Sequence, residues 1–193
     1  MPESSDPYVY PGSNVLRNLK DIRDPARLAA FEANAAWARL IQLEQAPWRG
    51  LFDAGHLQAI HKHIFQDVYA WAGQFRTVDI SKDGHLFARA PYIEASLRDL
   101  LGRLPAENFL RQPIAEEFAV RAGFYLTELN AVHPFREGNG RAQREFLREL
   151  AVQAGFGLDW RRVTREEMIA ASRESFASGA SARLVAVVRS CLV

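Results

Sequence analysis

The chain has 193 residues, of which 48% are hydrophobic and 24% charged, a balance typical of a globular protein that buries a core without disulfides or metals. Its formal net charge of +1 excludes a strongly basic surface, so we expect no direct binding to nucleic acid. The single cysteine, Cys191, favours a reducing compartment. No apolar stretch approaches the roughly 18 residues of a membrane span, and Met1 to Asp6 lack the pattern of a signal peptide. We therefore expect one cytoplasmic domain over residues 1–193 that makes no membrane contact.

The first part of the chain is predicted to hold an irregular arm and two helices. Residues 1–23 form the arm, which we expect to lie on the body. Asp24-Pro25 predicts a helix start, because a capping residue precedes proline at the first helical position, and Pro47 marks the end. Asp53 is the predicted cap of the next helix. The apolar positions at helical spacing are Leu28, Phe31, Ala35 and Ala38 in the first helix, and Leu57, Ile60, Ile64 and Val68 in the second.

Residues 74–88 carry the only β-like pattern. Two short extended runs flank Lys82-Asp83-Gly84-His85, and Asp-Gly between such runs is typical of a hairpin turn.

Helical spacing resumes after the predicted hairpin. Expected helices cover residues 92–101, a segment that begins at Pro113, residues of about 140–154, a segment opened by a Thr164/Glu167 capping box, and a last segment through Leu184 and Leu192. The predicted fold class is therefore mainly α, a helical bundle with one short β-hairpin.

Residues 133–144 combine features that favour phosphate binding. Gly138 and Gly140 allow the backbone to approach a ligand closely, and the helix that starts there presents free N–H groups. Arg141 and Arg144 are three residues apart, so they share one helix face above this anion site and can hold further phosphate oxygens.

Three neighbouring side chains add chemistry to the anion site. Glu137 offers a hard oxygen ligand, which suits Mg²⁺ held jointly by protein and phosphate. His133 precedes the loop, and histidine is the side chain best matched to proton transfer near neutral pH. Phe135 is expected to anchor the loop in the core and so fix His133. Together these groups supply what transfer to a hydroxyl requires: deprotonation, alignment and neutralisation of the leaving charge.

Each feature alone has an ordinary structural explanation. A Glu-Gly-Asn-Gly run is often only a turn, and two arginines at helical spacing are often a solvated face, which Arg148 continues without needing a role. A lone histidine is more often structural, as we expect for His56, His61 and His63. The functional interpretation depends on all the features occurring within twelve residues between two well-patterned helices.

The segment from His133 to Arg144 resembles the signature of the Fic family, His-x-Phe-x-Asp/Glu-Gly-Asn-Gly-Arg-x-x-Arg, and matches every specified position. The resemblance extends to the arm around Tyr8 to Gly12, the segment from Leu57 to Gly73, and the hairpin with Lys82. These look like the arm, helix and flap of small bacterial Fic toxins, which implies a Fic-fold helical bundle.

The resemblance implies a role for each matched residue. His133 would be the general base on the target hydroxyl, Glu137 would bind Mg²⁺, and Asn139 would hold the α-phosphate. The amides of Gly138 and Gly140, with Arg141 and Arg144, would hold the β- and γ-phosphates of ATP. The hairpin would dock the target's backbone as an added strand and border the nucleotide. Its residues would be Ser81, Lys82, Asp83, Gly84, His85, Leu86 and Phe87, although an ordinary surface turn is the alternative.

The expected function is that of a protein adenylyltransferase that moves AMP from ATP to a hydroxyl side chain. One alternative within the family resembles Doc, which phosphorylates its target and carries a lysine in the anion loop, where this chain has glycines. Transfer of UMP or phosphocholine also fits the motif. A different class, a non-catalytic nucleotide- or DNA-binding helical module, is disfavoured by the near-neutral charge and by the complete catalytic set.

Fic enzymes are commonly inhibited by a helix with the pattern Ser/Thr-x-x-x-Glu-Gly/Asn, whose glutamate pairs with the second motif arginine, here Arg144. Glutamate precedes Gly or Asn only at Glu137 and Glu107, and neither has Ser or Thr four residues earlier. We therefore expect a toxin that is silenced by a separate small antitoxin. The alternative is a degenerate internal helix around Glu174. The resemblance also suggests gyrase or topoisomerase IV as the target protein.

Overall fold

The structure, a computed structural model, describes residues 6–111 and 114–193. Its elements are helices α1 (Pro25–Gln45), α2 (Ala54–Phe65), α3 (Ile93–Leu101), α4 (Ala115–Val132), α5 (Asn139–Ala154), α6 (Arg165–Ser178) and α7 (Ala182–Cys191), strands β1 (Ser81–Lys82) and β2 (His85–Leu86), and short 3-10 turns η1 (Ala90–Tyr92), η2 (Asn108–Leu110) and η3 (Trp160–Arg162). The mainly helical fold class is confirmed.

The helix starts follow the predicted capping chemistry. The Asp24 carboxylate accepts a hydrogen bond from the amide of Arg27, and Asp53 does the same for His56. Thr164 and Glu167 form the reciprocal capping box of α6. The predicted helix start at Pro113 lies outside the described residues, and the described part of that helix begins at Ala115.

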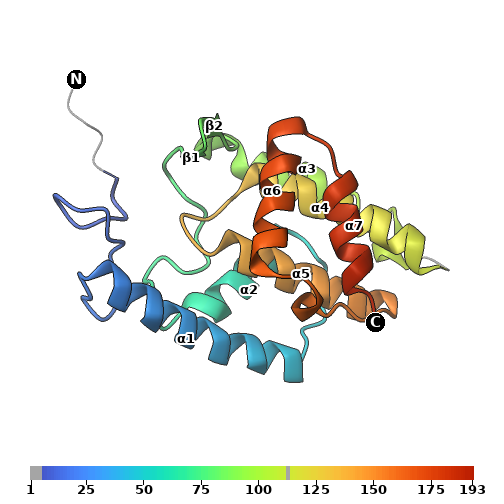
Figure 1. The fold of residues 1–193 in the computed structure, drawn as a ribbon, viewed down its shortest axis with the longest axis horizontal. Coiled ribbons are helices and arrows are strands. Elements are labelled where there is room, and N and C mark those ends of the chain that lie inside the picture. Colours follow the sequence, from blue (N-terminus) through green and yellow to red (C-terminus); the bar gives the residue numbers. More distant parts are fainter. Residues whose placement is uncertain (1–5, 112–113) are drawn as a thin grey trace.

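Helix α4 lies at the centre of the bundle and packs against α3, α5, α6 and α7 (Figure 1). Helix α5 packs in turn against α2, and α2 against α1, so α1 forms the outer layer on that side. Fully buried aromatic side chains fill the space between α4, α5 and the elements around them, including Phe118, Tyr125 and Phe146. The two helices that flank the predicted anion site therefore both pack into the core.

Two details of the sequence prediction were wrong. Ala38 is exposed, and the buried positions of α1 are Leu28, Ala36 and Leu43, because α1 contacts the body with a narrower stripe than the pattern suggested. Val68 is buried, but it lies in turns beyond the end of α2 at Phe65.

The predicted hairpin over residues 74–88 is present but much shorter than expected. Only two residues on each side pair, with Ser81 opposite Leu86 and Lys82 opposite His85. The residues before β1 make hydrogen bonds to the loop after α4 instead of to a neighbouring strand: the Arg76 amide, for example, donates to the Pro134 carbonyl. The arm is irregular as expected, with one bridge between Val9 and Leu16.

Within residues 6–111 and 114–193, no helix combines the length and the apolar character that crossing a membrane requires.

Candidate active site

The loop between α4 and α5 is closed by its own backbone and by Asn139. The Asn139 side chain accepts from the Phe135 amide at 2.8 Å and donates to the Phe135 carbonyl at 2.7 Å. One amide hydrogen of Asn139 remains free for a ligand. Gly138 stands at the helix start with φ of +79°, so the first amides of α5 face outward without intrahelical partners.

Gly138 also lies directly on an aromatic ring. A β-carbon at this position would come within 2.2 Å of the Phe65 ring at the end of α2. The loop therefore has no room for a side chain here, and its amides can approach an anion closely.

Phe135 is fully buried and anchors the loop as predicted. Its ring stacks on that of His61, with centroids 3.8 Å apart. The Gly73 amide donates to His61 Nδ1, so the ring proton lies on Nε2, which donates to the Glu137 carbonyl at 2.9 Å. Burial lowers the pKa of His61 to about 4, which keeps the ring neutral. His61 is thus structural, as expected, and it fixes the anion loop through its contacts with Phe135 and the Glu137 carbonyl.

His133 caps α4 in a left-handed conformation, with φ of +48°. Its Nδ1–H donates a hydrogen bond to the Asn130 carbonyl at 3.3 Å, and Nε2, which has no hydrogen-bond partner among the described residues, is left as an acceptor. Burial, opposed by the Asn130 hydrogen bond, lowers the pKa of His133 to about 4. The ring stacks on Phe87 at 3.9 Å. At pH 7 His133 is a neutral base with one open nitrogen.

A cavity of about 1030 Å³ lies between α1, α5 and α6 and reaches the anion loop. Arg141 and Arg144 both line it, as the helical spacing predicted. Arg144 has no carboxylate partner within 4 Å among the described residues, and burial lowers its pKa to about 10, so it stays charged. Arg148 lines the cavity as well but is paired with Glu145 at 2.6 Å. Of the three arginines that α5 places on this cavity, Arg144 is therefore the one without an ion pair in the described residues, and it can bind an anion.

Arg141 is held by a carboxylate that the sequence analysis did not single out. Glu32 of α1 forms an ion pair with Arg141 and accepts a hydrogen bond from the Tyr69 hydroxyl. The guanidinium also lies 4.6 Å from the centre of the Phe65 ring. These contacts fix the direction of Arg141 and link α1 to the anion site.

Glu137 is the candidate metal ligand. Its side chain is 46% exposed at the cavity, with Oε1 accepting from the Gly138 amide at 2.8 Å and lying 3.7 Å from Arg141. In the described parts of the chain, His, Cys, Asp and Glu side chains nowhere form a group of three or more that could hold a metal ion. One exposed carboxylate beside an anion site fits Mg²⁺ that takes its remaining ligands from phosphate and water.

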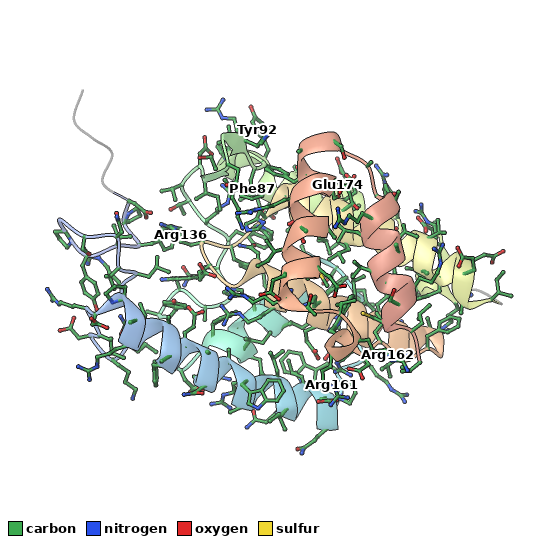
Figure 2. The ribbon with its side chains drawn as sticks, viewed as in Figure 1. Phe87, Tyr92, Arg136, Arg161, Arg162 and Glu174 are labelled. Carbon is green, nitrogen blue, oxygen red and sulfur yellow. The ribbon has the colours of Figure 1, made fainter. Side chains whose placement is uncertain are left out.

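The hairpin splits into an exposed tip and a buried base. Residues 81–86 are exposed, whereas Phe87 is buried between His133 and Phe176 of α6. Figure 2 shows Phe87 between the hairpin and α6. Phe87 thus differs from its predicted neighbours because it supports the histidine and is not available at the surface.

Arg76 is the other residue that sequence reasoning missed. Its side chain is fully buried and donates hydrogen bonds to backbone carbonyls around His133 and the hairpin. The sequence around Arg76 does not indicate that this arginine is buried, because its partners are backbone carbonyls, which every residue has.

The fold and the site define a helical domain with an anion-binding helix start next to a neutral histidine. The chain belongs to the Fic/DOC family, whose profile matches residues 51–151.

Several proteins with related sequences are protein adenylyltransferases by name. The chain is 48% identical over 173 residues to the protein adenylyltransferase VbhT of Bartonella schoenbuchensis, covering 90% of this chain but only 36% of VbhT. It is 42% identical to the probable protein adenylyltransferase Fic of Salmonella typhimurium, covering 85% of this chain and 81% of that protein. Among solved structures, BepC of Bartonella tribocorum with bound AMPPNP has a TM-score of 0.92 at 28% identity, covering 96% of both chains.

Proposed function

We propose that this chain is a protein adenylyltransferase that moves AMP from ATP to a hydroxyl side chain of another protein. The proposal treats residues 1–193 as one Fic domain that works in the cytoplasm. The observation that carries it is the unpaired Arg144, which lines a cavity large enough for a nucleotide beside a loop that holds a neutral histidine. The names of the related proteins support the same reaction.

The proposed step needs one base and one set of phosphate clamps. His133 Nε2 takes the proton of the target hydroxyl, whose oxygen attacks the α-phosphorus. The bond from that phosphorus to the oxygen bridging to the β-phosphate breaks, and pyrophosphate leaves. The second amide hydrogen of Asn139 supports the α-phosphate. The amides of Gly138 and Gly140, with Arg141 and Arg144, hold the β- and γ-phosphates, and the Gly138 amide exchanges its hydrogen bond to Glu137 Oε1 for one to phosphate.

Glu137 would hold Mg²⁺ jointly with the phosphates. When bound there, the ion would neutralise charge on the leaving pyrophosphate. Dependence of labelling on Mg²⁺ also separates this proposal from a passive nucleotide-binding module, which would label no protein with or without the metal.

Gly138 and Gly140 favour AMP transfer over phosphorylation, because they leave room for the orientation of ATP that AMP transfer uses. Where the Doc-like branch carries a lysine in the anion loop, this chain has glycines, and Phe65 fills the space that a side chain at Gly138 would need. ATP labelled on either the α- or the γ-phosphate, followed into protein, tests this directly. Label from the α-position alone supports adenylyl transfer, and label from the γ-position alone would establish a kinase.

A separate inhibitor protein is the second part of the proposal. Arg144 has no carboxylate partner among the described residues. Glu107 is engaged by Arg121 and Tyr125. Glu174 lies near the end of α6, in the region of Phe87 (Figure 2), and forms an ion pair with Arg183 of α7. Neither glutamate pairs with Arg144, which supports an inhibitory helix supplied by a separate protein over one around Glu174.

The cavity offers a place for an antitoxin helix. From Arg144 it continues into an apolar trough between α1 and the start of α6, lined by Leu28, Ala36, Trp37, Leu40, Val163 and Met168. Trp37 is 58% exposed. A helix with the pattern Ser/Thr-x-x-x-Glu-Gly/Asn would cover this trough and set its glutamate on Arg144.

Expression of the chain in bacteria, alone or with the small open reading frame beside its gene, tests the toxin proposal. We expect growth arrest by the chain alone and rescue by the partner. A harmless isolated chain would contradict it. Gyrase and topoisomerase IV are the proposed targets, and labelling a bacterial lysate with α-labelled ATP followed by identification of the labelled band tests that choice.

A further inference from the structure

Arg76 is a buried cation held by carbonyls alone. Arg76 is 2% exposed, and no carboxylate of the described residues lies within ion-pair distance of it. Burial lowers the pKa of Arg76, and the charge of the more distant Asp79 only partly opposes this. Buried arginines are ordinarily paired with an acid, because an unpaired charge loses its hydration on burial. Here the guanidinium donates to four backbone carbonyls, those of Val78, Ala88, Val132 and His133.

The four carbonyls belong to two structures that must meet for transfer. Val78 precedes β1 and Ala88 follows β2, so these two residues are the stems of the hairpin. Val132 and His133 are the last residue of α4 and its cap. Carbonyls at a helix C-terminus lack intrahelical partners and carry the negative end of the helix dipole, so a buried cation is favoured there.

Neighbouring backbone contacts strengthen the same junction. The Arg76 amide donates to the Pro134 carbonyl at 2.9 Å, and the Ala88 amide donates to the Ala131 carbonyl at 3.2 Å. Nε of Arg76 reaches the His133 carbonyl at 2.9 Å, where the backbone adopts its left-handed conformation. The guanidinium therefore binds both stems of the hairpin and the backbone of the proposed base at once.

We propose that Arg76 is a positioning residue that fixes the hairpin relative to His133, so that a hydroxyl docked along the hairpin meets the histidine nitrogen. This inference rests on the proposed transfer reaction. A planar guanidinium reaches several carbonyls through three separate nitrogens, whereas a lysine ammonium offers donors from one atom only. Charge alone is therefore insufficient, and Arg76→Lys is the informative variant.

The test compares Arg76→Lys with Arg121→Lys, a second arginine that is tied into a network away from the hairpin. The ATP dissociation constant is measured by calorimetry, and the initial rate of transfer from α-labelled ATP into lysate proteins is measured at saturating ATP. For Arg76→Lys we expect an ATP dissociation constant within about threefold of wild type and a transfer rate lower by roughly 10- to 100-fold, the loss typical of a misplaced reacting group. Arg121→Lys should retain both values.

Three outcomes would overturn the inference. These are a transfer rate in Arg76→Lys within threefold of wild type, equal losses of ATP binding and transfer, or equal losses of transfer in both variants. Absence of labelling by the wild-type chain would instead contradict the proposed function.

If Arg76→Lys does not fold, hydrogen exchange on the wild-type chain decides. The amide of Ala88 should then exchange as slowly as the amides of α4. Exchange of the Ala88 amide as fast as that of Gly84 at the exposed tip would overturn the inference.

Discussion

The ring of His61 lies 3.8 Å from the ring of Phe135, with the two planes only 17° apart. This stack joins α2 to the anion loop, because His61 also donates to the Glu137 carbonyl and accepts from the Gly73 amide. The loop is therefore preorganised before any nucleotide arrives, which reduces the ordering that binding would otherwise require.

His61→Ala should destabilise the fold and weaken nucleotide binding together. The change removes a buried ring and two hydrogen bonds, which typically costs about 2–4 kcal/mol. Looser anchoring of the loop should reduce ATP affinity by up to about tenfold, the equivalent of one hydrogen bond. Urea unfolding and calorimetry measure the two effects. Lys62→Ala, at an exposed position of the same helix, is the control, and similar losses in both variants would contradict this role.

Gly138→Ala should be far more damaging than Gly84→Ala. Both glycines have φ near +80°, but a β-carbon at Gly84 meets nothing within 4 Å, whereas one at Gly138 meets the Phe65 ring. Gly84→Ala therefore reports the backbone strain alone, about 1 kcal/mol. Gly138→Ala adds overpacking of roughly 1–3 kcal/mol and should abolish ATP binding. Equal melting temperatures for the two variants would exclude the close approach.

Arg144→Ala should weaken ATP binding more than ADP binding without destabilising the protein. The guanidinium is largely buried and unpaired, so its removal relieves a desolvation cost. Arg148→Ala is the matched control, because it leaves the buried Glu145 carboxylate without its ion-pair partner. This variant should have a lower melting temperature but no selective loss of ATP affinity. Equal losses of ATP and ADP affinity in Arg144→Ala would mean that this arginine does not meet the γ-phosphate.

His133 should remain neutral well below pH 6. Burial lowers its pKa to about 4, and the charges of Arg76 and Lys82, which face it from the hairpin, act in the same direction. The base is therefore fully available at pH 7, and protonation removes it only as the pH approaches 4. Because the folded pKa lies below the unfolded value of about 6.5, the associated stability is present above pH 6.5 and declines as the pH falls toward 4. Histidine NMR titration checks this, and a midpoint for His133 between 6 and 7 would contradict it.

The anion loop and the helix starts could be predicted because their chemistry is local. Asp24, Asp53 and Thr164 cap the helices that follow them, and Gly138 adopts the left-handed conformation that its lack of a side chain allows. Arg76 and Glu32 could not be predicted. Their partners are backbone carbonyls and a residue more than a hundred positions away, and neither leaves a pattern in the sequence. The length of the hairpin strands was overestimated, because the amides of Arg76 and Ala88 donate to the loop after α4 and to the end of α4 instead of extending the pairing of β1 with β2.

The most direct test of the account compares wild type with His133→Ala in two measurements on the same preparations: ATP binding by calorimetry and transfer of label from α-labelled ATP into protein. Loss of a positioned base typically lowers the rate by about 10²–10⁴-fold. We expect a loss of that size in transfer by His133→Ala, with ATP affinity and melting temperature close to wild type. Transfer by His133→Ala within tenfold of wild type would contradict the role of His133 as the base.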